Sequence, residues 1–290
     1  MKFIQKAYLL IIFLLVLGNF FVWQEIFRVD RNFLKVIFFD LGQAEAIFIK
    51  TPKGHQILID GGSTKKILEK LSSEIPFWDR TIDLIILSHP DSDHLGGLNY
   101  ILERYRVEYI LWTGVKRETK TFKKWLEKIE KEIKKEKAKV IIAQKGQKIK
   151  AGKAEIYILY PFQSLKGKIF KKTANESSVV AKLSFFKNSF LFTGDINKKI
   201  EKELIETSLK DLKSEVLKIP HHGSKYSNFF DFLKKTKAQL AIIFCGRDNK
   251  YNYPHPIVLK NLKNLDIKVL RTDQDGDIKL ISNGNKIMIK

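Results

Sequence analysis

Cysteine is almost absent from this chain of 290 residues, because Cys245 is its only one. A single cysteine cannot form a disulfide within the chain, so cysteine content does not indicate the cellular compartment. Acidic residues are also scarce, with 32 Asp and Glu against 53 Lys and Arg and a net charge of +21. This excess favours polyanionic partners such as nucleic acid, anionic polymers or acidic lipid. Lysines spread along a whole chain are equally typical of a solvated surface.

Long hydrophobic runs are absent except for one at the N-terminus. Residues 7–23, AYLLIIFLLVLGNFFVW, contain no charge, and a helix rising about 1.5 Å per residue there nearly crosses a hydrocarbon core of about 30 Å. No A-x-A-like cleavage site follows, and Trp23 suits a membrane interface. We expect residues 1–28 to be an uncleaved single-pass anchor in the cell membrane, with a signal segment as the alternative, and residues 32–290 to be an extracellular catalytic domain. Basic residues on both sides leave the orientation open: Lys2, Lys6, Arg28, Arg31 and Lys35.

The rest of the chain has no short-period repeat and no long low-complexity linker. Short runs rich in β-branched and aromatic residues predict strands at 34–39, 46–49, 56–60, 83–88, 108–112, 139–143, 154–160, 179–186, 189–194, 215–219, 239–244, 267–270, 277–281 and 286–289. Apolar stripes at helical spacing predict helices over 119–137 (Phe122, Trp125, Leu126, Ile129, Ile133) and after an Asn197 N-cap (Ile200, Leu204, Ile205, Leu209), with shorter ones near 64–74, 228–236 and 256–264. Alternating strands and helices predict a layered α/β fold with mixed sheets.

Ligand-type side chains follow the apolar strand DLIILS in the loop SHPDSDHLGG. His89, Asp91, Asp93 and His94 lie within six positions there, and imidazole and carboxylate groups bind divalent ions such as zinc or manganese. On its own, the loop is explained equally well as a polar strand end whose Asp93 caps a helix starting near Leu95.

Two further apolar strands end in the same way. LFTGD ends in Asp195, and KIPHHGS carries His221 and His222. Ligands in open α/β sheets bind where strands end. The three strand ends together therefore predict a metal site built from distant segments.

These motifs resemble those of the metallo-β-lactamase fold, and most closely the soluble domain of ComEC-type competence proteins, which handle DNA at the cell surface. The resemblance runs through residues 34–281 and rests on FFDLGQAEAIFI (38–49), ILIDGG (57–62), LIILSHPDSDHLGG (84–97), NESSVV (175–180), FLFTGDI (190–196), LKIPHHGSKYS (217–227), NKYNYPHPIVL (249–259) and RTDQDGDI (271–278). It implies a four-layer αββα sandwich of two mixed β-sheets, a dinuclear metal centre and hydrolytic chemistry.

The sequence departs from the family pattern at a few positions. Asp91 stands where the usual metallo-β-lactamase signature has His, although ComEC-type domains also have Asp there. Asn175 stands where many relatives have another His ligand, and GQAEA replaces the usual GQGDA. We expect one anchor in place of the multi-span channel segment of competence proteins, and a separate channel subunit as an additional partner.

The resemblance implies a ligand set for two divalent ions, Zn²⁺ or Mn²⁺: His89, Asp91, Asp93, His94, Asp195 and one of His221 and His222. Asp195 is expected to bridge the ions because a carboxylate has two oxygens to share. Asp60 is expected to brace the metal loop. We expect Asp93, His222 and His255 to act in catalysis, and Ser224, Asn175 and His255 to contact substrate. A loop histidine and a turn serine are the plainer interpretations of His255 and Ser224.

The leading hypothesis is a membrane-anchored, metal-dependent phosphodiesterase or nuclease that acts on DNA at the cell surface. Residues 161–176 support it, because this long irregular stretch carries Lys166, Lys168, Lys171, Lys172 and Phe170, which can grip a strand by charge and stacking or form a solvated loop. A second hypothesis keeps the metals but changes the substrate to cell-wall polymer, lipid head group or ester. A third is a metal-poor DNA-binding accessory module, which metal content distinguishes. The oligomeric state is not predicted.

Overall fold

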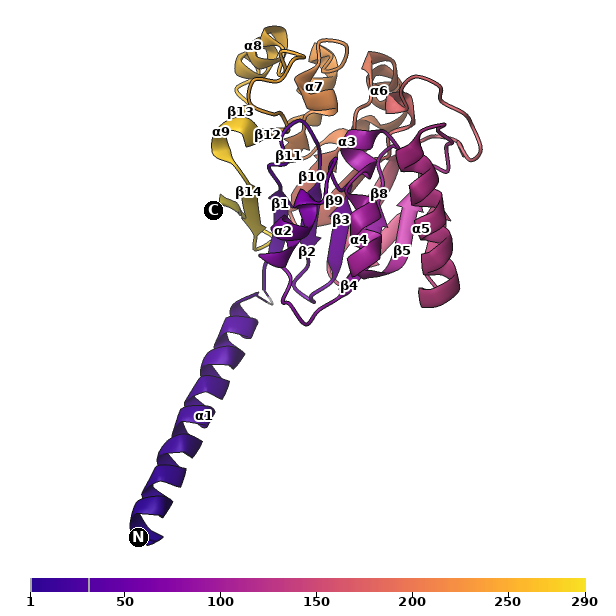
Figure 1. Cartoon of the computed structure of the whole chain (residues 1–290). Coiled ribbons are helices and arrows are strands. Elements are labelled where there is room, and N and C mark those ends of the chain that lie inside the picture. The colour runs from indigo at the N-terminus through magenta and orange to yellow at the C-terminus, as the bar shows by residue number, and fades with distance from the viewer. Residues whose placement is uncertain (1, 31) are drawn as a thin grey trace.

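The structure is a computed structural model that describes residues 2–30 and 32–290, with the side chains of residues 4–23 and 32–290. Helix α1 (Lys2–Asp30) extends away from the rest of the molecule (Figure 1). Its segment Ile4–Trp23 has a mean hydropathy of 2.0 and none of it is buried. An apolar helix without cover is a candidate membrane span or signal sequence rather than a core helix. The expected basic flank at Lys2, Arg28 and Arg31 lies outside the described side chains.

Two mixed β-sheets form the centre of the domain. The first has the order β15 (Ile287–Ile289), β14 (Ile278–Ser282), β1 (Leu34–Phe38), β2 (Ile47–Lys50), β3 (Gln56–Ile59), β4 (Thr81–Ile86), β5 (Arg106–Trp112) and β6 (Lys139–Ile142). The second has the order β13 (Lys268–Arg271), β12 (Leu240–Ile243), β11 (Val216–Lys218), β10 (Asn188–Phe192), β9 (Val180–Phe185), β8 (Ala154–Tyr160) and β7 (Lys148–Ala151). Strands β3 to β6 and β10 to β13 run parallel, and the remaining pairs are antiparallel.

The two sheets pack face to face and helices cover their outer faces. Phe38 in β1 lies with its ring centroid 6.3 Å from that of Phe192 and 5.9 Å from that of Phe244, which joins the sheets across the buried core. On the first sheet pack α2 (Lys66–Ser72), α4 (Leu98–Arg104) and α5 (Lys120–Glu136). On the second pack α6 (Lys198–Leu212), α7 (Phe230–Thr236) and α8 (Pro256–Asn264). The expected αββα sandwich is confirmed (Figure 1).

Each strand expected from the sequence is present, with ends within two residues. Strand β7 was not expected, because its Lys-Ile-Lys-Ala sequence offers little apolar surface at a sheet edge. The two apolar stripes expected on helices are only partly buried, so this prediction is partly wrong. Leu126 and Ile133 of α5 are 41% and 44% exposed, and Leu209 of α6 is 43% exposed just after Ser208 leaves helical geometry. Asn197 caps α6 as expected by accepting from two backbone N–H groups.

Candidate metal centre

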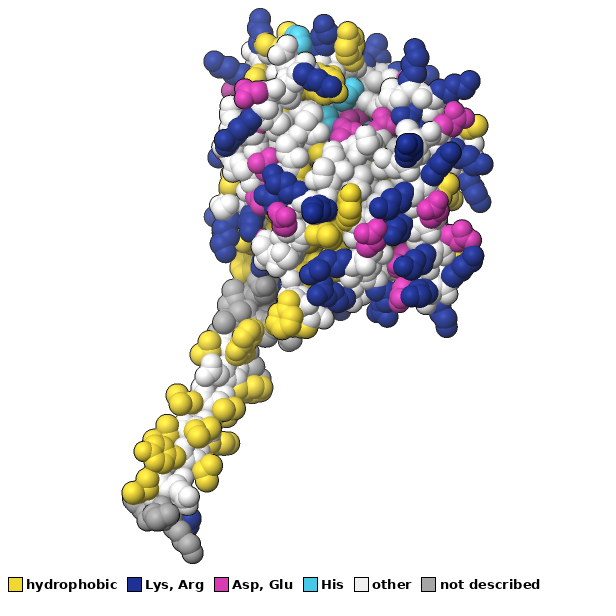
Figure 2. Space-filling model, viewed as in Figure 1, with side chains coloured by type: hydrophobic (Ala, Val, Ile, Leu, Met, Phe, Trp, Pro, Cys, Tyr) yellow, Lys and Arg dark blue, Asp and Glu magenta, His cyan; other side chains and the backbone are white. Residues whose placement is uncertain are grey.

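Three strand ends from both sheets meet at one edge of the sandwich. His94 belongs to α3 (Ser92–Leu95), which follows β4, while Asp195 follows β10 and His222 lies in the short 3₁₀ turn η2 (Pro220–Gly223) after β11. With Asp93, they offer ligand atoms that all lie within 4.8 Å of one another. Figure 2 shows histidine side chains on the upper part of the domain with acidic side chains next to them, amid many Lys and Arg side chains. The expected convergence of distant segments is therefore present.

The separations within this cluster suit a single divalent ion. His94 Nε2 lies 3.4 Å from Asp195 Oδ2 and 3.7 Å from Asp93 Oδ2. His222 Nε2 lies 3.6 Å and 3.5 Å from the same two oxygens. A tetrahedral ion with ligand bonds of about 2.1 Å separates its ligands by about 3.4 Å. The four side chains thus form a coordination shell of the right size.

The tautomers of His94 and His222 are fixed by hydrogen bonds on the side of each ring that faces away from the cluster. Nδ1 of His94 donates to Asp60 Oδ2 at 2.8 Å, and Nδ1 of His222 donates to the carbonyl of Phe244 at 3.0 Å. Each ring therefore presents the lone pair of Nε2 to the cluster. Both Nε2 atoms are buried and have no hydrogen-bond partner among the described residues. Asp60 braces the loop, as expected, and also accepts from the backbone and hydroxyl of Ser88.

Backbone geometry decides which of the twin histidines joins the cluster. His221 and His222 have φ values of 48° and 54°, in the left-handed region that side chains disfavour. Gly223 follows at φ 80°, and a Cβ there would lie 2.6 Å from Pro254 Cβ, so only glycine fits. This turn directs His222 into the cluster and leaves His221 beside Tyr253, with ring centroids 5.7 Å apart.

Close backbone approach positions the metal loop itself. A Cβ on Gly97 would lie 1.8 Å from the carbonyl oxygen of Gly61, so the glycines of HLGG and IDGG let the two segments touch. Gly61 N donates to His94 O at 2.8 Å, and Gly97 N donates to Gly62 O at 2.7 Å. These bonds hold the loop that carries Asp93 and His94.

A buried lysine supports Asp195 from behind. Lys218 Nζ lies 3.3 Å from Asp195 Oδ1, donates to Gly194 O at 2.7 Å and pairs with Glu45. Burial alone would lower the pKa of Lys218, but the Glu45 and Asp195 carboxylates outweigh it and raise the pKa. Lys218 is thus positively charged and contacts Oδ1 of Asp195. The other oxygen of this carboxylate, Oδ2, faces the cluster. Glu45, Asp60 and His94 also lie within 4.8 Å of one another, but Lys218 and Ser88 already satisfy these carboxylates.

The charges of the cluster suit a divalent cation. Burial would raise the pKa of Asp93, but the neighbouring His94 and His222 outweigh it and lower the pKa. Burial likewise would lower the pKa of His94, yet Asp195, Asp93 and Asp60 raise it well above its usual value. The carboxylates thus favour a positive charge beside the two Nε2 atoms. A divalent ion supplies the same positive charge.

At the expected second ion position, protein groups already contact the Asp91 carboxylate. His89 Nε2 lies 3.9 Å from Asp91 Oδ2, but the Asp91 carboxylate is already neutralised by Arg117 Nη2 at 3.2 Å. Asp91 also accepts from Thr173 Oγ1 at 2.9 Å and Ala174 N at 3.2 Å. The Asn175 amide lies 3.3 Å from His221 Nε2. Among the described residues, the four-ligand group therefore comprises Asp93, His94, Asp195 and His222, and His89 and Asp91 lie outside it.

Two expected substrate residues lie apart from the cluster. His255 does not line the metal cavity; its Nδ1 accepts from Ile257 N at 3.2 Å and caps α8. Ser224 is fully buried, and its Oγ accepts from the hydroxyl of Tyr253 at 3.1 Å. Both geometries correspond to the plainer interpretations, a loop histidine and a turn serine.

Sequence reasoning missed two residues that shape the site. Lys218 was detectable in principle, because a lone lysine in the apolar strand before PHHGS is anomalous. Arg117 carries no such signal. Its guanidinium also donates to the carbonyls of Phe170 and Lys172 at 2.6 and 2.7 Å, which ties the long loop to the segment after β5.

Comparison with known proteins identifies the family. Residues 39–247 match the model of the metallo-β-lactamase superfamily. The chain belongs to the metallo-β-lactamase superfamily. This member has the hydrolase fold of the superfamily and a cluster of ligand-type residues that suggests a divalent-metal site.

The curated relatives of this superfamily member are named as competence or recombination proteins. ComE operon protein 3 of Bacillus subtilis (strain 168) is 30% identical over 82% of this chain and 32% of its own length. Recombination protein 2 of Haemophilus influenzae is 28% identical over 83% of this chain and 28% of its own. Competence protein ComA of Neisseria gonorrhoeae is 27% identical over 86% and 32%. The chain thus spans about a third of the length of these relatives.

Solved structures share the fold of this superfamily member. The metallo-β-lactamase fold protein YhfI from Bacillus subtilis aligns with a TM-score of 0.54 at 16% identity, covering 86% of this chain and 99% of YhfI. A variant of the CmlA β-hydroxylase aligns with a TM-score of 0.53 at 15% identity, covering 85% of this chain and 53% of that one. Identities this low show the fold alone.

Proposed function

We propose that the chain is a membrane-anchored, metal-dependent phosphodiesterase that cleaves DNA at the cell surface. The observation that carries this proposal is the cluster of Asp93, His94, Asp195 and His222 beside an open cavity of about 280 Å³. The net charge of +21 favours a polyanionic substrate. The names of three relatives, which are competence or recombination proteins, favour DNA among polyanions.

The residues around the cluster have different roles in the proposed reaction. The chemistry that a bound divalent ion supplies is polarisation of a phosphoryl oxygen and activation of water. Asp60 and the Phe244 carbonyl orient the two imidazole ligands, and Lys218 orients Asp195. His221 lines the cavity next to the ligands, and burial lowers its pKa so that it is neutral. We therefore assign to His221, in place of His255, the hydrogen bond to a substrate oxygen.

We further propose one ion per chain. The cluster combines two carboxylates with two imidazoles, a mixed set that suits zinc and manganese alike. The salt bridge between Arg117 and Asp91 supplies at the second position a positive charge that needs no metal. The metal content of purified protein, measured by plasma mass spectrometry, tests this proposal. A value near zero after loading with zinc or manganese supports the accessory-module hypothesis instead.

The anchor belongs to the proposal because α1 is long, apolar and uncovered. Its hydrophobic segment holds the domain at the membrane, with the catalytic domain on the outer side. A separate channel subunit remains a proposed partner, to be sought by crosslinking in intact cells. Sedimentation of the full chain with membranes after carbonate washing tests the anchor, since a cleaved signal sequence would leave the domain in the supernatant.

The decisive experiment is a hydrolysis assay with the full chain in detergent. Single-stranded and duplex DNA are compared with bis-p-nitrophenyl phosphate, in zinc, manganese or chelator. We expect metal-dependent DNA cleavage that Asp93→Ala abolishes and the exposed-surface variant Glu127→Ala retains. Hydrolysis of bis-p-nitrophenyl phosphate without DNA cleavage would indicate that the natural substrate is a phosphodiester other than DNA. Equal DNA cleavage by Asp93→Ala removes the proposal.

A further inference from the structure

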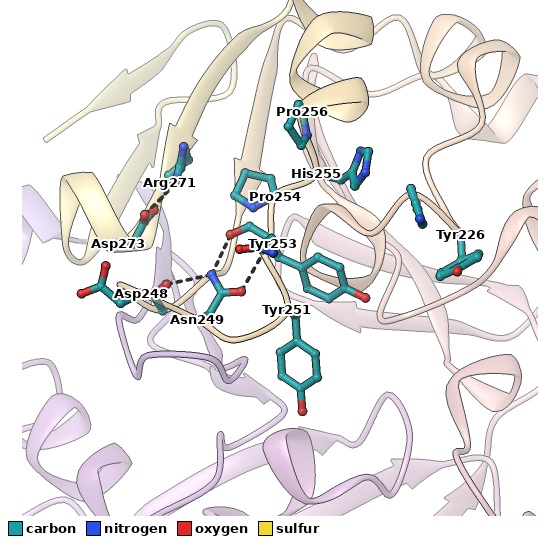
Figure 3. A pocket seen from close by; sticks show the side chains of 13 residues that line it. Tyr226, Asp248, Asn249, Tyr251, Tyr253, Pro254, His255, Pro256, Arg271 and Asp273 are labelled. Atoms are coloured by element: carbon teal, nitrogen blue, oxygen red, sulfur yellow. Dashed lines mark hydrogen bonds and ion pairs between the residues drawn. The ribbon is translucent and has the colours of Figure 1, made fainter.

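A cavity of about 840 Å³ lies next to the metal cavity and is lined by tyrosines (Figure 3). Tyr251 and Tyr253 line both cavities, so these two side chains lie at the border between them. Tyr226 lines the larger cavity from the segment after the histidine turn. We propose that these three tyrosines form a platform on which the bases of single-stranded DNA stack beside the scissile phosphate. This inference rests on the proposed function and names the form of its substrate.

The tyrosine rings have the exposure and orientation that stacking of a base requires. Tyr251 and Tyr253 are stacked, with ring centroids 5.6 Å apart and planes 21° from parallel. Tyr251 is 55% exposed and Tyr226 is 67% exposed. Exposed aromatic side chains that are grouped in one place are typical of a binding surface, and every base offers a π-face. In a duplex the faces of the bases are already covered, so this surface fits an unpaired strand.

The loop that displays the tyrosines is preorganised. Asn249 donates to the carbonyls of Gly246 and Tyr253 at 3.0 and 2.7 Å and accepts from Tyr253 N at 2.9 Å. These bonds are drawn in Figure 3, with the Tyr251 and Tyr253 side chains projecting from the same loop. Because the loop is already fixed, it loses little conformational entropy when a base binds.

The same loop is joined to the metal-binding turn. Buried Ser224 accepts from the Tyr253 hydroxyl at 3.1 Å and from Tyr226 N at 3.3 Å. His255 N donates to Gly223 O at 2.9 Å. Gly223 and Ser224 directly follow His222, so the platform is held at a fixed distance from the metal cluster. The role of Ser224 is then to position tyrosines rather than to bind phosphate.

The charge around the platform suits a phosphate backbone. Lys250 Nζ lies 5.3 Å from the ring centroid of Tyr251, and Lys225 Nζ lies 5.4 Å from that of Tyr226. Each exposed ring thus has a cation beside it, which can contact phosphate while the base stacks. Asp273, which also lines the cavity, is neutralised by Arg271 at 2.6 Å. Asp248 is the remaining acidic side chain among the described lining residues.

Binding of fluorescein-labelled oligonucleotides to the full chain in detergent and chelator tests the platform, with fluorescence anisotropy as the readout. The probes are an oligothymidine, an abasic strand of the same length, a duplex and a labelled teichoic-acid polymer. We expect Tyr251→Ala and Tyr226→Ala each to weaken oligothymidine binding about tenfold and to leave abasic-strand binding unchanged. Tyr251→Phe keeps the ring and should bind as the wild type does. Tyr109→Ala is the matched control, because Tyr109 is also partly exposed beside a lysine, Lys139, on the first sheet.

The outcomes separate this inference from the proposed function. Equal binding of oligothymidine and the abasic strand by the wild type overturns the platform, as does a Tyr251→Ala variant that binds like Tyr109→Ala. Tyrosine-dependent binding of a teichoic-acid polymer without such binding of oligothymidine also overturns it. DNA cleavage that is unaffected by both tyrosine substitutions removes the platform and keeps the nuclease. Tyrosine-dependent binding without any metal-dependent cleavage supports the platform and removes the nuclease.

Discussion

The ammonium of Lys218 lies 3.3 Å from Oδ1 of Asp195, while His94 Nε2 lies 3.4 Å from Oδ2 of the same carboxylate. One carboxylate therefore faces a permanent protein cation on one side and the metal cluster on the other. Both Lys218 and Asp195 are almost fully buried, so their interaction is little screened by solvent. This relationship makes Lys218 a positioning residue for the metal centre.

Replacing this lysine should weaken metal binding. We expect Lys218→Met to lower the affinity for zinc or manganese about 10- to 100-fold, as loss of a group that orients a ligand commonly does. It should also destabilise the fold by about 3 to 5 kcal/mol, because Glu45 loses its buried partner. Isothermal titration with metal and urea unfolding measure the two effects. Glu45→Gln added to Lys218→Met should recover part of the stability, and the exposed-surface variant Lys234→Met should change neither.

The salt bridge at Asp91 predicts the metal stoichiometry. We expect one ion per wild-type chain, because Arg117 already neutralises Asp91. Removing the cation and supplying the absent imidazole, in the double variant Arg117→Ala and Asn175→His, should raise the content towards two. Plasma mass spectrometry after dialysis counts the ions. Two tightly held ions in the wild type would contradict this account of the second position.

Substitutions of His221 and His222 should have different effects on metal affinity and hydrolysis. His222→Ala removes a ligand-type atom from the cluster, so we expect metal affinity and hydrolysis to fall together, each by more than about 100-fold. His221→Ala should keep metal affinity within a few-fold and lower kcat, since His221 only lines the cavity. Metal titration and steady-state kinetics of each variant provide the comparison. The reverse pattern would exchange the two assignments.

Glu201 should make stability depend on pH. It accepts from Asn228 N and Phe229 N at 2.6 and 2.7 Å, and burial raises its pKa to about 7 from an ordinary 4.5. Between these values the folded state binds more protons than the unfolded state, so this group's contribution to stability is full below about pH 4.5 and is lost as pH rises to 7. The loss is at most about 3 kcal/mol.

Urea unfolding at pH 5 and pH 8 measures this contribution. Glu201→Gln cannot ionise, so its free energy of unfolding should change less between the two pH values than that of the wild type. The exposed neighbour Glu206→Gln should retain the wild-type pH dependence. Identical pH dependence in wild type and Glu201→Gln would assign the titration to other groups.

Much of the fold follows from patterns that span only a few residues. Alternating or continuous apolar residues gave every strand except β7, whose Lys148 and Lys150 interrupt the pattern at a sheet edge. The ligand-type residues were identifiable because His94, Asp195 and His222 each follow an apolar strand, and strand ends gather at one edge. The exposed Leu126 and Ile133 were not predictable, because periodicity does not say how far a helix face is covered.

The sequence by itself determined the hydrophobic N-terminal helix, a layered α/β fold with mixed sheets and the ligand-type residues of the metal centre, because periodicity and residue type are local properties. The two-sheet sandwich was implied by the resemblance to the metallo-β-lactamase fold. The tertiary structure alone decided that His222 rather than His221 joins the cluster, through a left-handed turn held by packing. It also decided that Arg117 pairs with Asp91 and that Lys218 pairs with Glu45 and Asp195. Such pairings join segments far apart in the chain, and no local pattern encodes which side chains meet when the sheets close on each other.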